Sequence, residues 1–250
     1  WAGGYLNNVA AEGLEFLGYP YLAELAQRPE YRVISETIAD EMTRKWIRFK
    51  GKSTDGNDRT TERIKELTDE FENLEVRDRF RALALQDGFF GRSHLYLDFG
   101  VEIGPGNKEL ATPIGSGRDA ASRGKIKKGS LKRLQTIEAV WTYPTTYNAT
   151  NPLKEDWYNP QVWYVMGQEI HRSRLPTFIG HPVPDLLKPA YSFGGLSLSQ
   201  MAKPYVDIWL KTRESVGALI HSFSVMVLMT DLSTILQPGN AGGLLQGVGL

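Results

Sequence analysis

The stretch DGFFGRSHLYLDFG, residues 87 to 100, changes its hydrophobic period partway along. Upstream of it, apolar side chains recur every three or four positions, whereas Leu95, Leu97 and Phe99 take every second position. The first period indicates an amphipathic helix and the second a strand with one buried face. A turn bounded by glycines separates them. The stretch therefore predicts a helix, a turn and a strand in succession, and with them an α+β fold.

Further helices are predicted upstream. Residues 20 to 28 predict a short helix between two turn signals. Residues 30 to 46 predict a helix with charged residues on one face and a buried stripe of Tyr31, Ile34, Ile38, Met42 and Trp46 on the other. The hexapeptide WIRFKG that ends at Gly51 predicts a short strand. Residues 60 to 87 predict one or two charged helices whose buried stripe is Ile64, Leu67, Phe71, Leu74, Phe80, Leu83 and Ala84.

The second half of the chain predicts mostly strands and then a long helix. Residues 134 to 144 read as a strand, and residues 162 to 180 read as a β-hairpin turning at Gly167. A helix is predicted from about 199 to 222, with Ser197 or Ser199 as its N-cap. Its apolar face would be Met201, Tyr205, Ile208, Trp209, Val216, Leu219 and Ile220. Residues 224 to 232 predict a return strand.

Composition limits the possible functions. The chain has 250 residues with 29 basic and 29 acidic side chains, so its formal net charge is zero. A protein that binds nucleic acid tightly usually carries a basic surplus, so any such contact must be local. Cysteine is absent, which excludes disulfides and thiolate metal sites. No complete nucleotide-binding motif is present, so we expect no cofactor, and no apolar run is long enough to predict a membrane span.

One segment departs from this neutrality. Residues 104 to 133 contain eight Lys or Arg side chains, two acidic ones and six glycines. This composition predicts an exposed basic loop. The side chains with which such a loop could contact DNA phosphates are Lys125, Lys127, Lys128, Lys132 and Arg133.

The polar run EIHRSRLPTFIG, residues 169 to 180, has the strongest appearance of catalytic chemistry. His171 and Ser173 form an H-x-S motif, of which a two-histidine phosphodiesterase needs two copies, one histidine serving as base and one as acid. None of the other histidines is followed by Ser or Thr two positions on. The spacing of the histidines also predicts no metal site. If the segment is a strand, His171 and Ser173 share one face and Arg174 lies on the other. We therefore expect no catalytic residue here.

Four stretches together resemble tailed-bacteriophage portal proteins. They are FLGYPYLAELAQRPEYRVISETIADEMTRKW, QDGFFGRSHLYLDFG, DWYNPQVWYVMGQEIHRSRLPTFIG and FGGLSLSQMAKPYVDIWLKTRESVGALIHSF. Their order is more specific than any one of them and covers roughly residues 16 to 235. The chain looks closest to the portal subgroup whose N-terminal domain is also found fused to anti-CBASS phosphodiesterases. In this reading His171, Ser173 and Arg174 are a family signature on a structural strand, and the chain looks like a C-terminally truncated portal core.

The resemblance implies an α+β architecture in regions. These would be a wing of helices and short mixed strands (14–103), the basic Gly-rich loop (104–133), a β-rich clip (134–190), a stem helix with a return strand (191–235) and a disordered or truncated tail (236–250). It also implies a structural, non-enzymatic head-tail connector of the virion, a homo-oligomeric ring of about twelve subunits at one capsid vertex. Double-stranded DNA would be packaged and ejected through the ring.

The implied partners are the terminase, the capsid and the tail adaptor proteins, with no membrane, and assembly would take place in the host cytoplasm. Two alternatives stay open at this point. One is a nucleotide phosphodiesterase that uses the incomplete H-x-S motif, and the other is a DNA-binding adaptor of the head-tail joint.

Overall fold

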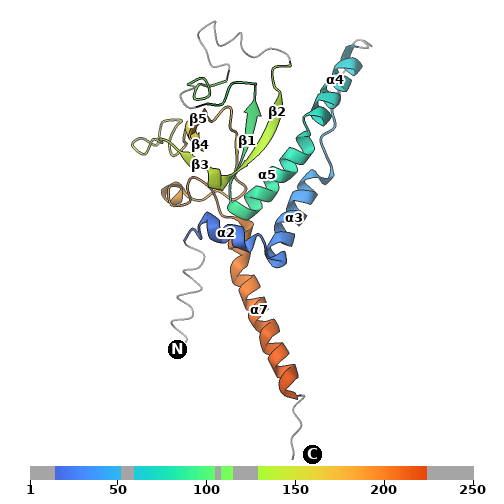
Figure 1. Cartoon of the computed structure of the whole chain (residues 1–250), viewed down its shortest axis with the longest axis vertical. Coiled ribbons are helices and arrows are strands. Elements are labelled where there is room, and N and C mark those ends of the chain that lie inside the picture. Colours follow the sequence, from blue (N-terminus) through green and yellow to red (C-terminus); the bar gives the residue numbers. More distant parts are fainter. Residues whose placement is uncertain (1–14, 52–58, 105–107, 115–128, 224–250) are drawn as a thin grey trace, which may run out of the picture. The chain divides into compact units, whose positions relative to one another are not determined.

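The computed structural model describes residues 15–51, 59–104, 108–114 and 129–223. The chain divides into two compact units, of which the second begins at Asp207. In the described residues, the first unit holds four helices and two small antiparallel sheets, and the second holds the C-terminal part of one long helix. The α+β class predicted from the sequence is confirmed (Figure 1).

The N-terminal region is helical, as predicted. Its elements are α2 (Tyr19–Leu25), α3 (Pro29–Arg44), α4 (Arg59–Asn73) and α5 (Val76–Phe90). Helices α2 and α3 both carry proline in their first turn. Proline is tolerated there because the first backbone N–H groups of a helix have no acceptor within the helix. The strand predicted for WIRFKG is wrong, because residues 46–51 are neither helix nor strand.

The predicted buried stripe of α3 is largely wrong. The helix buries Tyr31, Ser35, Ala39 and Thr43, and among the predicted positions only Tyr31 is buried. Ile38 is 40% exposed and Met42 54% exposed. The side of α3 with small side chains packs on α5, because helix axes approach closely only where side chains are short. Similarly, Leu67 of α4 and Phe80 of α5 are 42% and 45% exposed, although the sequence places them in a buried stripe.

The first sheet is built on the strand predicted by the opening stretch. β1 (Ser93–Asp98) is its central strand, flanked by β2 (Arg133–Glu138) and β6 (Thr177–Phe178) in the antiparallel order β2-β1-β6. Leu95 faces Thr136 in the β1-β2 register. Because successive side chains alternate across a strand, Leu95 packs with α5 residues, whereas Tyr96 packs on the opposite side of the sheet.

The second sheet has the order β3-β4-β5, made of β3 (Thr142–Pro144), β4 (Val162–Val165) and β5 (Gln168–His171). The predicted hairpin between β4 and β5 is confirmed. It turns on Met166 and Gly167, whose φ angles of 44° and 97° lie in the left-handed region. A two-residue turn of this kind follows the right-handed twist of the paired strands, and glycine enters it without steric cost.

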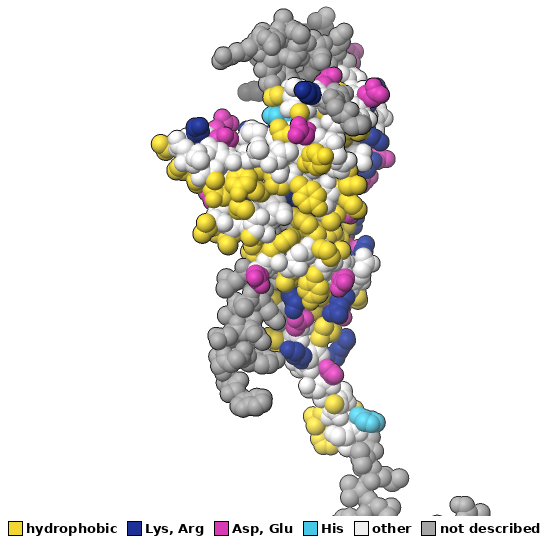
Figure 2. Space-filling view, turned by 60° about the vertical axis from the view of Figure 1, so that its left-hand side comes forward, with side chains coloured by type: hydrophobic (Ala, Val, Ile, Leu, Met, Phe, Trp, Pro, Cys, Tyr) yellow, Lys and Arg dark blue, Asp and Glu magenta, His cyan; other side chains and the backbone are white. Residues whose placement is uncertain are grey.

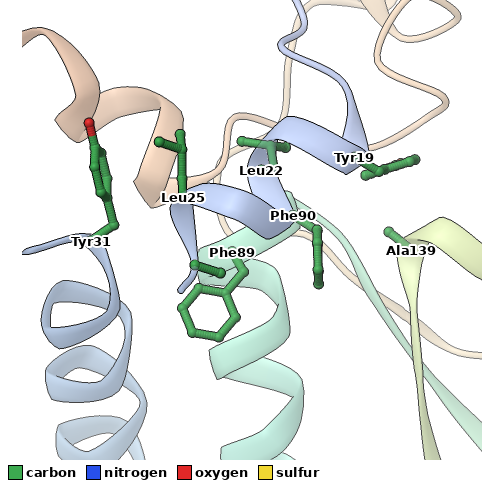
Figure 3. Close-up of a cluster of buried hydrophobic side chains, with 8 residues drawn as sticks. Tyr19, Leu22, Leu25, Tyr31, Phe89, Phe90 and Ala139 are labelled. Carbon is green, nitrogen blue, oxygen red and sulfur yellow. The ribbon is translucent and has the colours of Figure 1, made fainter. Parts of the chain in front are cut away.

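The first unit is layered. α3 packs on α5, α5 packs on β1 and β2, and Tyr96 of β1 packs against Trp163 and Ile170 of the second sheet. The cores between these layers are apolar clusters. Figure 3 shows one of them, where Leu22 and Leu25 of α2 lie over Phe89 and Phe90 at the end of α5. The layer order is therefore α3, α5, first sheet, second sheet.

The long C-terminal helix is confirmed as α7 (Leu198–Phe223). The backbone N–H of Gln200 donates to the Ser197 hydroxyl at 3.0 Å, which makes Ser197 the N-cap. The strand predicted for residues 224 to 232 lies outside the described residues.

Candidate functional site

The motif of His171, Ser173 and Arg174 lies on a turn. β5 ends at His171, and residues 172–174 form a turn, so the predicted alternation of these side chains across a strand is wrong. The turn closes with a hydrogen bond from the Arg174 backbone N–H to the His171 carbonyl at 2.9 Å. It brings His171 and Ser173 together through a bend, since the His171 Nδ1 lies 3.0 Å from the Ser173 hydroxyl.

This turn holds the segment that leads into the basic loop. The His171 backbone N–H donates to the Leu110 carbonyl at 2.8 Å, and the Arg174 Nε donates to the Thr112 carbonyl at 3.1 Å. The Ser173 hydroxyl accepts the backbone N–H of Ile114 at 2.8 Å. Residues 171, 173 and 174 thus hydrogen-bond to three alternate residues of one segment, Leu110, Thr112 and Ile114. We call this set of contacts the clamp. The motif therefore holds residues 110–114 in place.

The imidazole of His171 forms its hydrogen bonds within the same turn. Burial, with the neighbouring cations Arg172 and Arg174, lowers the pKa of His171 below its ordinary value, so the ring is neutral at pH 7. The Ser173 backbone N–H donates to Nδ1 at 3.1 Å, which makes Nδ1 an acceptor. A groove of about 530 Å³ is lined by Arg172 and Ser173, but His171 is not among its lining residues. The arrangement supports anchoring rather than acid-base chemistry.

The clamp gives a local prediction. Ser173→Ala removes the acceptor of the Ile114 N–H, and a lost hydrogen bond at a partly buried group costs about 1 kcal/mol. We expect amide hydrogen exchange at Ile114 to become faster by about fivefold, while global stability changes little. Thr145→Ala is the matched control, because it removes a hydroxyl that donates to the Val162 carbonyl at 2.8 Å, outside the clamp. Unchanged protection of Ile114 would contradict the clamp.

The DNA-contact candidates divide into two groups. Lys125, Lys127 and Lys128 lie outside the described residues. Arg133, the first residue of β2, forms an ion pair with Asp98 at 3.2 Å. The Lys132 ammonium group lies against Gly100, where a Cβ atom would meet its Nζ at 2.4 Å. In the described structure these two side chains thus pack at the end of the β1-β2 pair, where Arg133 already has a carboxylate partner.

Arg92 is a buried charged residue that the sequence analysis missed. It sits between α5 and β1 with its side chain fully buried. Its Nη2 donates to the carbonyls of Ala139 and Thr142 at 2.8 and 2.9 Å, and its Nη1 donates to the carbonyl of Ser192. The guanidinium also lies over the Trp163 ring, 4.7 Å from the ring centre. A single side chain therefore ties the β2-β3 connection and the residue-192 turn to the core.

The turn at Ser192 is strained. Ser192 and Phe193 have φ angles of 50° and 59°, in a region that non-glycine residues seldom adopt. Such a conformation persists where the surroundings hold it. Here Arg92 holds the Ser192 carbonyl, and Phe193 is buried among Tyr96, Trp163 and Ile170. The strained turn leads directly to the N-cap of α7, so Arg92 also sets where that helix begins.

A second buried charge also went unpredicted. Asp87, in the last turn of α5, is 6% exposed, and both of its carboxyl oxygens lie 3.1 Å from the Gly180 backbone N–H, which donates to them. Burial raises the pKa of Asp87 to about 6, opposed by the Gly180 hydrogen bond and by His181. A Cβ at position 180 would lie 2.5 Å from Asp87 Oδ2, so any larger residue there would displace the carboxyl group. The only indication in the sequence is that the acidic Asp87 stands next to apolar residues near the end of a helix.

The second unit presents an uncovered apolar seam on α7. From Trp209 onward, seam positions are spaced three and four residues apart, the spacing of coiled-coil contacts. The seam consists of Trp209, Thr212, Val216, Leu219 and Phe223. Trp209 is 50% exposed, Leu219 54% and Phe223 79%. The seam shares Trp209, Val216 and Leu219 with the predicted apolar face, and the part of the chain that the structure describes leaves these side chains exposed.

Two features are absent from the part of the chain that the structure describes. Three or more His, Asp or Glu side chains do not gather there into a metal-binding group. Among the same residues, none of the helices has the length and hydropathy needed to cross a membrane.

Comparison with protein families shows to which family the chain is similar. A protein-family model described as "Phage portal protein" matches residues 19–245 of the chain. This range contains α2 to α7 and both sheets. No curated protein matches the sequence significantly.

Proposed function

Because the chain belongs to the phage portal protein family, a family of structural proteins of the virion, we propose that its subunits form a ring at one capsid vertex. Double-stranded DNA would be packaged and ejected through this ring, which we expect to contain about twelve subunits. In this proposal the terminase docks on the ring during packaging, the capsid surrounds it, and tail adaptor proteins bind it later. Assembly takes place in the host cytoplasm.

The uncovered seam of α7 is the observation that carries the proposal. Soluble monomers seldom expose a contiguous row of large apolar side chains, and a row at three-four spacing is complementary to another helix. Every side chain from Lys211 to Phe223 is exposed. Identical helices packed side by side around a ring would bury this seam in each subunit. A homo-oligomer is thus the simplest state in which the apolar surface of α7 is covered.

The charge of the chain supports a conduit for DNA. Duplex DNA carries one negative charge about every 1.7 Å, so a subunit with a large basic surplus would hold it firmly. The formal net charge of this chain is zero, and Arg133 is paired with Asp98. Weak, scattered phosphate contacts allow DNA to slide. The regions named from the sequence fit the proposal as wing (14–103), clip (134–190) and stem (191–235).

A charge placed in the seam tests the proposal. Leu219→Glu would bury a carboxylate at every subunit contact of the ring, at a cost of several kcal/mol per interface. We expect negative-stain microscopy and native mass spectrometry to show rings of the wild-type chain and only monomers or small oligomers of the variant.

Ala218→Glu is the matched control. Ala218 lies one position before Leu219, on the opposite side of the helix from the seam, and is also exposed. This variant carries the same added charge and should assemble as the wild type does. Wild-type protein that stays monomeric at high concentration would refute the ring, and equal assembly of both variants would refute the role of the seam.

A further inference from the structure

The two outermost layers of the first unit both keep apolar side chains on their outer faces. The layers run from α3, through α5 and the first sheet, to the β3-β4-β5 sheet. In Figure 1 α3 and the β3-β4-β5 sheet lie on opposite sides of this unit. The outer layer of a small protein normally turns polar side chains to water. Two opposite faces that break this rule point to contacts outside the chain.

The outer face of the β3-β4-β5 sheet is aromatic. Tyr143 and Tyr164 lie directly opposite each other on β3 and β4, and are 56% and 43% exposed. Trp141, just before β3, is 49% exposed, and Met166 at the hairpin turn is 76% exposed. Glu169 of β5 lies opposite Tyr164 and adds one carboxylate. In Figure 2, which brings this side forward, hydrophobic side chains cover much of the middle of the first unit.

The exposed ridge of α3 is the apolar stripe that the sequence placed in the core. Ile34, Ile38 and Met42 are four residues apart and so form one ridge along the helix. Ile38 and Met42 are 40% and 54% exposed. Lys45, at the C-cap position of the helix, is also exposed and lies on the same side of the helix as this ridge. The α3 ridge is therefore apolar, with a cation at one end.

We propose that the aromatic face of the β3-β4-β5 sheet in one subunit packs on the α3 ridge of the next. The inference rests on the proposed ring and names the contact between neighbours in it. Contacts between two different faces of identical subunits run head to tail, and they close into a ring when the rotation between neighbours allows it. Because the two faces lie on opposite sides of the unit, each subunit can contact one neighbour with each face.

Chemical complementarity favours a second copy of this chain as the occupant. Each face is apolar at its centre, and large aromatic side chains against branched aliphatic ones bury much area per residue. Glu169 on the sheet and Lys45 at the end of the helix ridge are both exposed and carry opposite charges. The half-exposed apolar side chains on each face are of the kind that fills the centre of an interface.

Cross-linking tests the contact directly, because the chain contains no cysteine. The double variant Ile38→Cys/Tyr164→Cys places one thiol on each face, in layers separated within a chain by α5 and the first sheet. A short bismaleimide added to assembled protein should join successive subunits, and denaturing electrophoresis should show a ladder up to the full ring. Ile38→Cys/Leu153→Cys is the control, since Leu153 is 93% exposed and lies outside the sheet. It should give at most traces of dimer.

The outcomes separate this contact from the ring itself. Rings in the microscope with a ladder in the test variant alone support the proposed contact. Rings without a ladder above the control overturn the contact and leave the ring intact. Wild-type protein that forms no rings overturns both.

A charge exchange gives a second, independent readout. Lys45→Glu and Glu169→Lys should each lower the salt concentration at which rings dissociate, and the two changes combined in one chain should restore it. Losses that add in the combined variant would overturn the pairing of the two faces.

Discussion

Replacement of Arg92 by methionine is expected to remove a large part of the stability of the first unit. Methionine fills a similar volume but cannot donate hydrogen bonds, so the carbonyls of Thr142 and Ser192 lose their donor inside the core. A buried carbonyl left without a donor costs about 1 to 3 kcal/mol. Domains of this size are stable by about 5 to 15 kcal/mol, so the variant should unfold at much lower urea or accumulate as insoluble protein.

Urea titration followed by circular dichroism measures the effect. Arg32→Met is the matched control, because Arg32 also lies over an aromatic ring, that of Phe89 at 6.0 Å, but its side chain is 47% exposed. We expect the control to change the free energy of unfolding by less than about 1 kcal/mol. Arg92→Lys should fall between the two, since an ammonium group keeps the charge but cannot reach three carbonyls on two segments at once. If Arg92→Met and the control changed the free energy of unfolding equally, the buried hydrogen bonds of Arg92 would not stabilise the fold as proposed.

Asp87→Asn is expected to stabilise the protein at pH 8. The pKa of Asp87 is raised from 3.8 to about 6, so the folded state favours the protonated carboxyl. Its stabilising contribution is therefore complete below pH 3.8 and is lost as the pH rises through 6. The difference between these two pKa values corresponds to about 3 kcal/mol. Asparagine resembles the protonated acid and can still accept the Gly180 N–H, so the variant should keep this stability at high pH.

Urea titrations between pH 4 and pH 8 measure the prediction. The difference in free energy of unfolding between variant and wild type should be small at pH 4 and grow to about 3 kcal/mol above pH 7. Asp40→Asn is a control of opposite sign, because its hydrogen bond with Arg81 lowers the pKa of Asp40. The free energy of unfolding of that variant, relative to the wild type, should not increase as the pH rises. A difference for Asp87→Asn that does not depend on pH would show that the carboxyl is not perturbed by the fold.

Much of the local structure could be predicted from the sequence. The helix-to-strand change around residue 90, the β4-β5 hairpin and the long helix α7 all follow from hydrophobic period and turn residues, which act over a few neighbours. The order of motifs also pointed to the phage portal family, which the family match confirms. The motif of His171 and Ser173 was only partly understood. Its role depends on Leu110, Thr112 and Ile114, about 60 residues away, and no local pattern contains that information.

The helix α3 shows why hydrophobic period alone misleads. The sequence by itself determined that this segment is an amphipathic helix with an apolar stripe of Ile34, Ile38 and Met42. Which side of the helix faces α5 was decided by close packing, since Ser35, Ala39 and Thr43 allow the two helices to approach. The apolar ridge then stays outside, where it becomes available to a neighbouring subunit.

The sequence alone thus determined most of the secondary structure, the fold class and the family of this protein, because these depend on period, turn chemistry and motif order. Only the tertiary structure decided which charges are buried and which apolar faces are left open. Arg92 and Asp87 look like ordinary charged residues in the chain, and their properties come from segments distant in sequence: Ala139, Ser192 and Gly180. Burial and long-range hydrogen bonds are properties of the folded chain, and they set both the stability and the surfaces left for assembly.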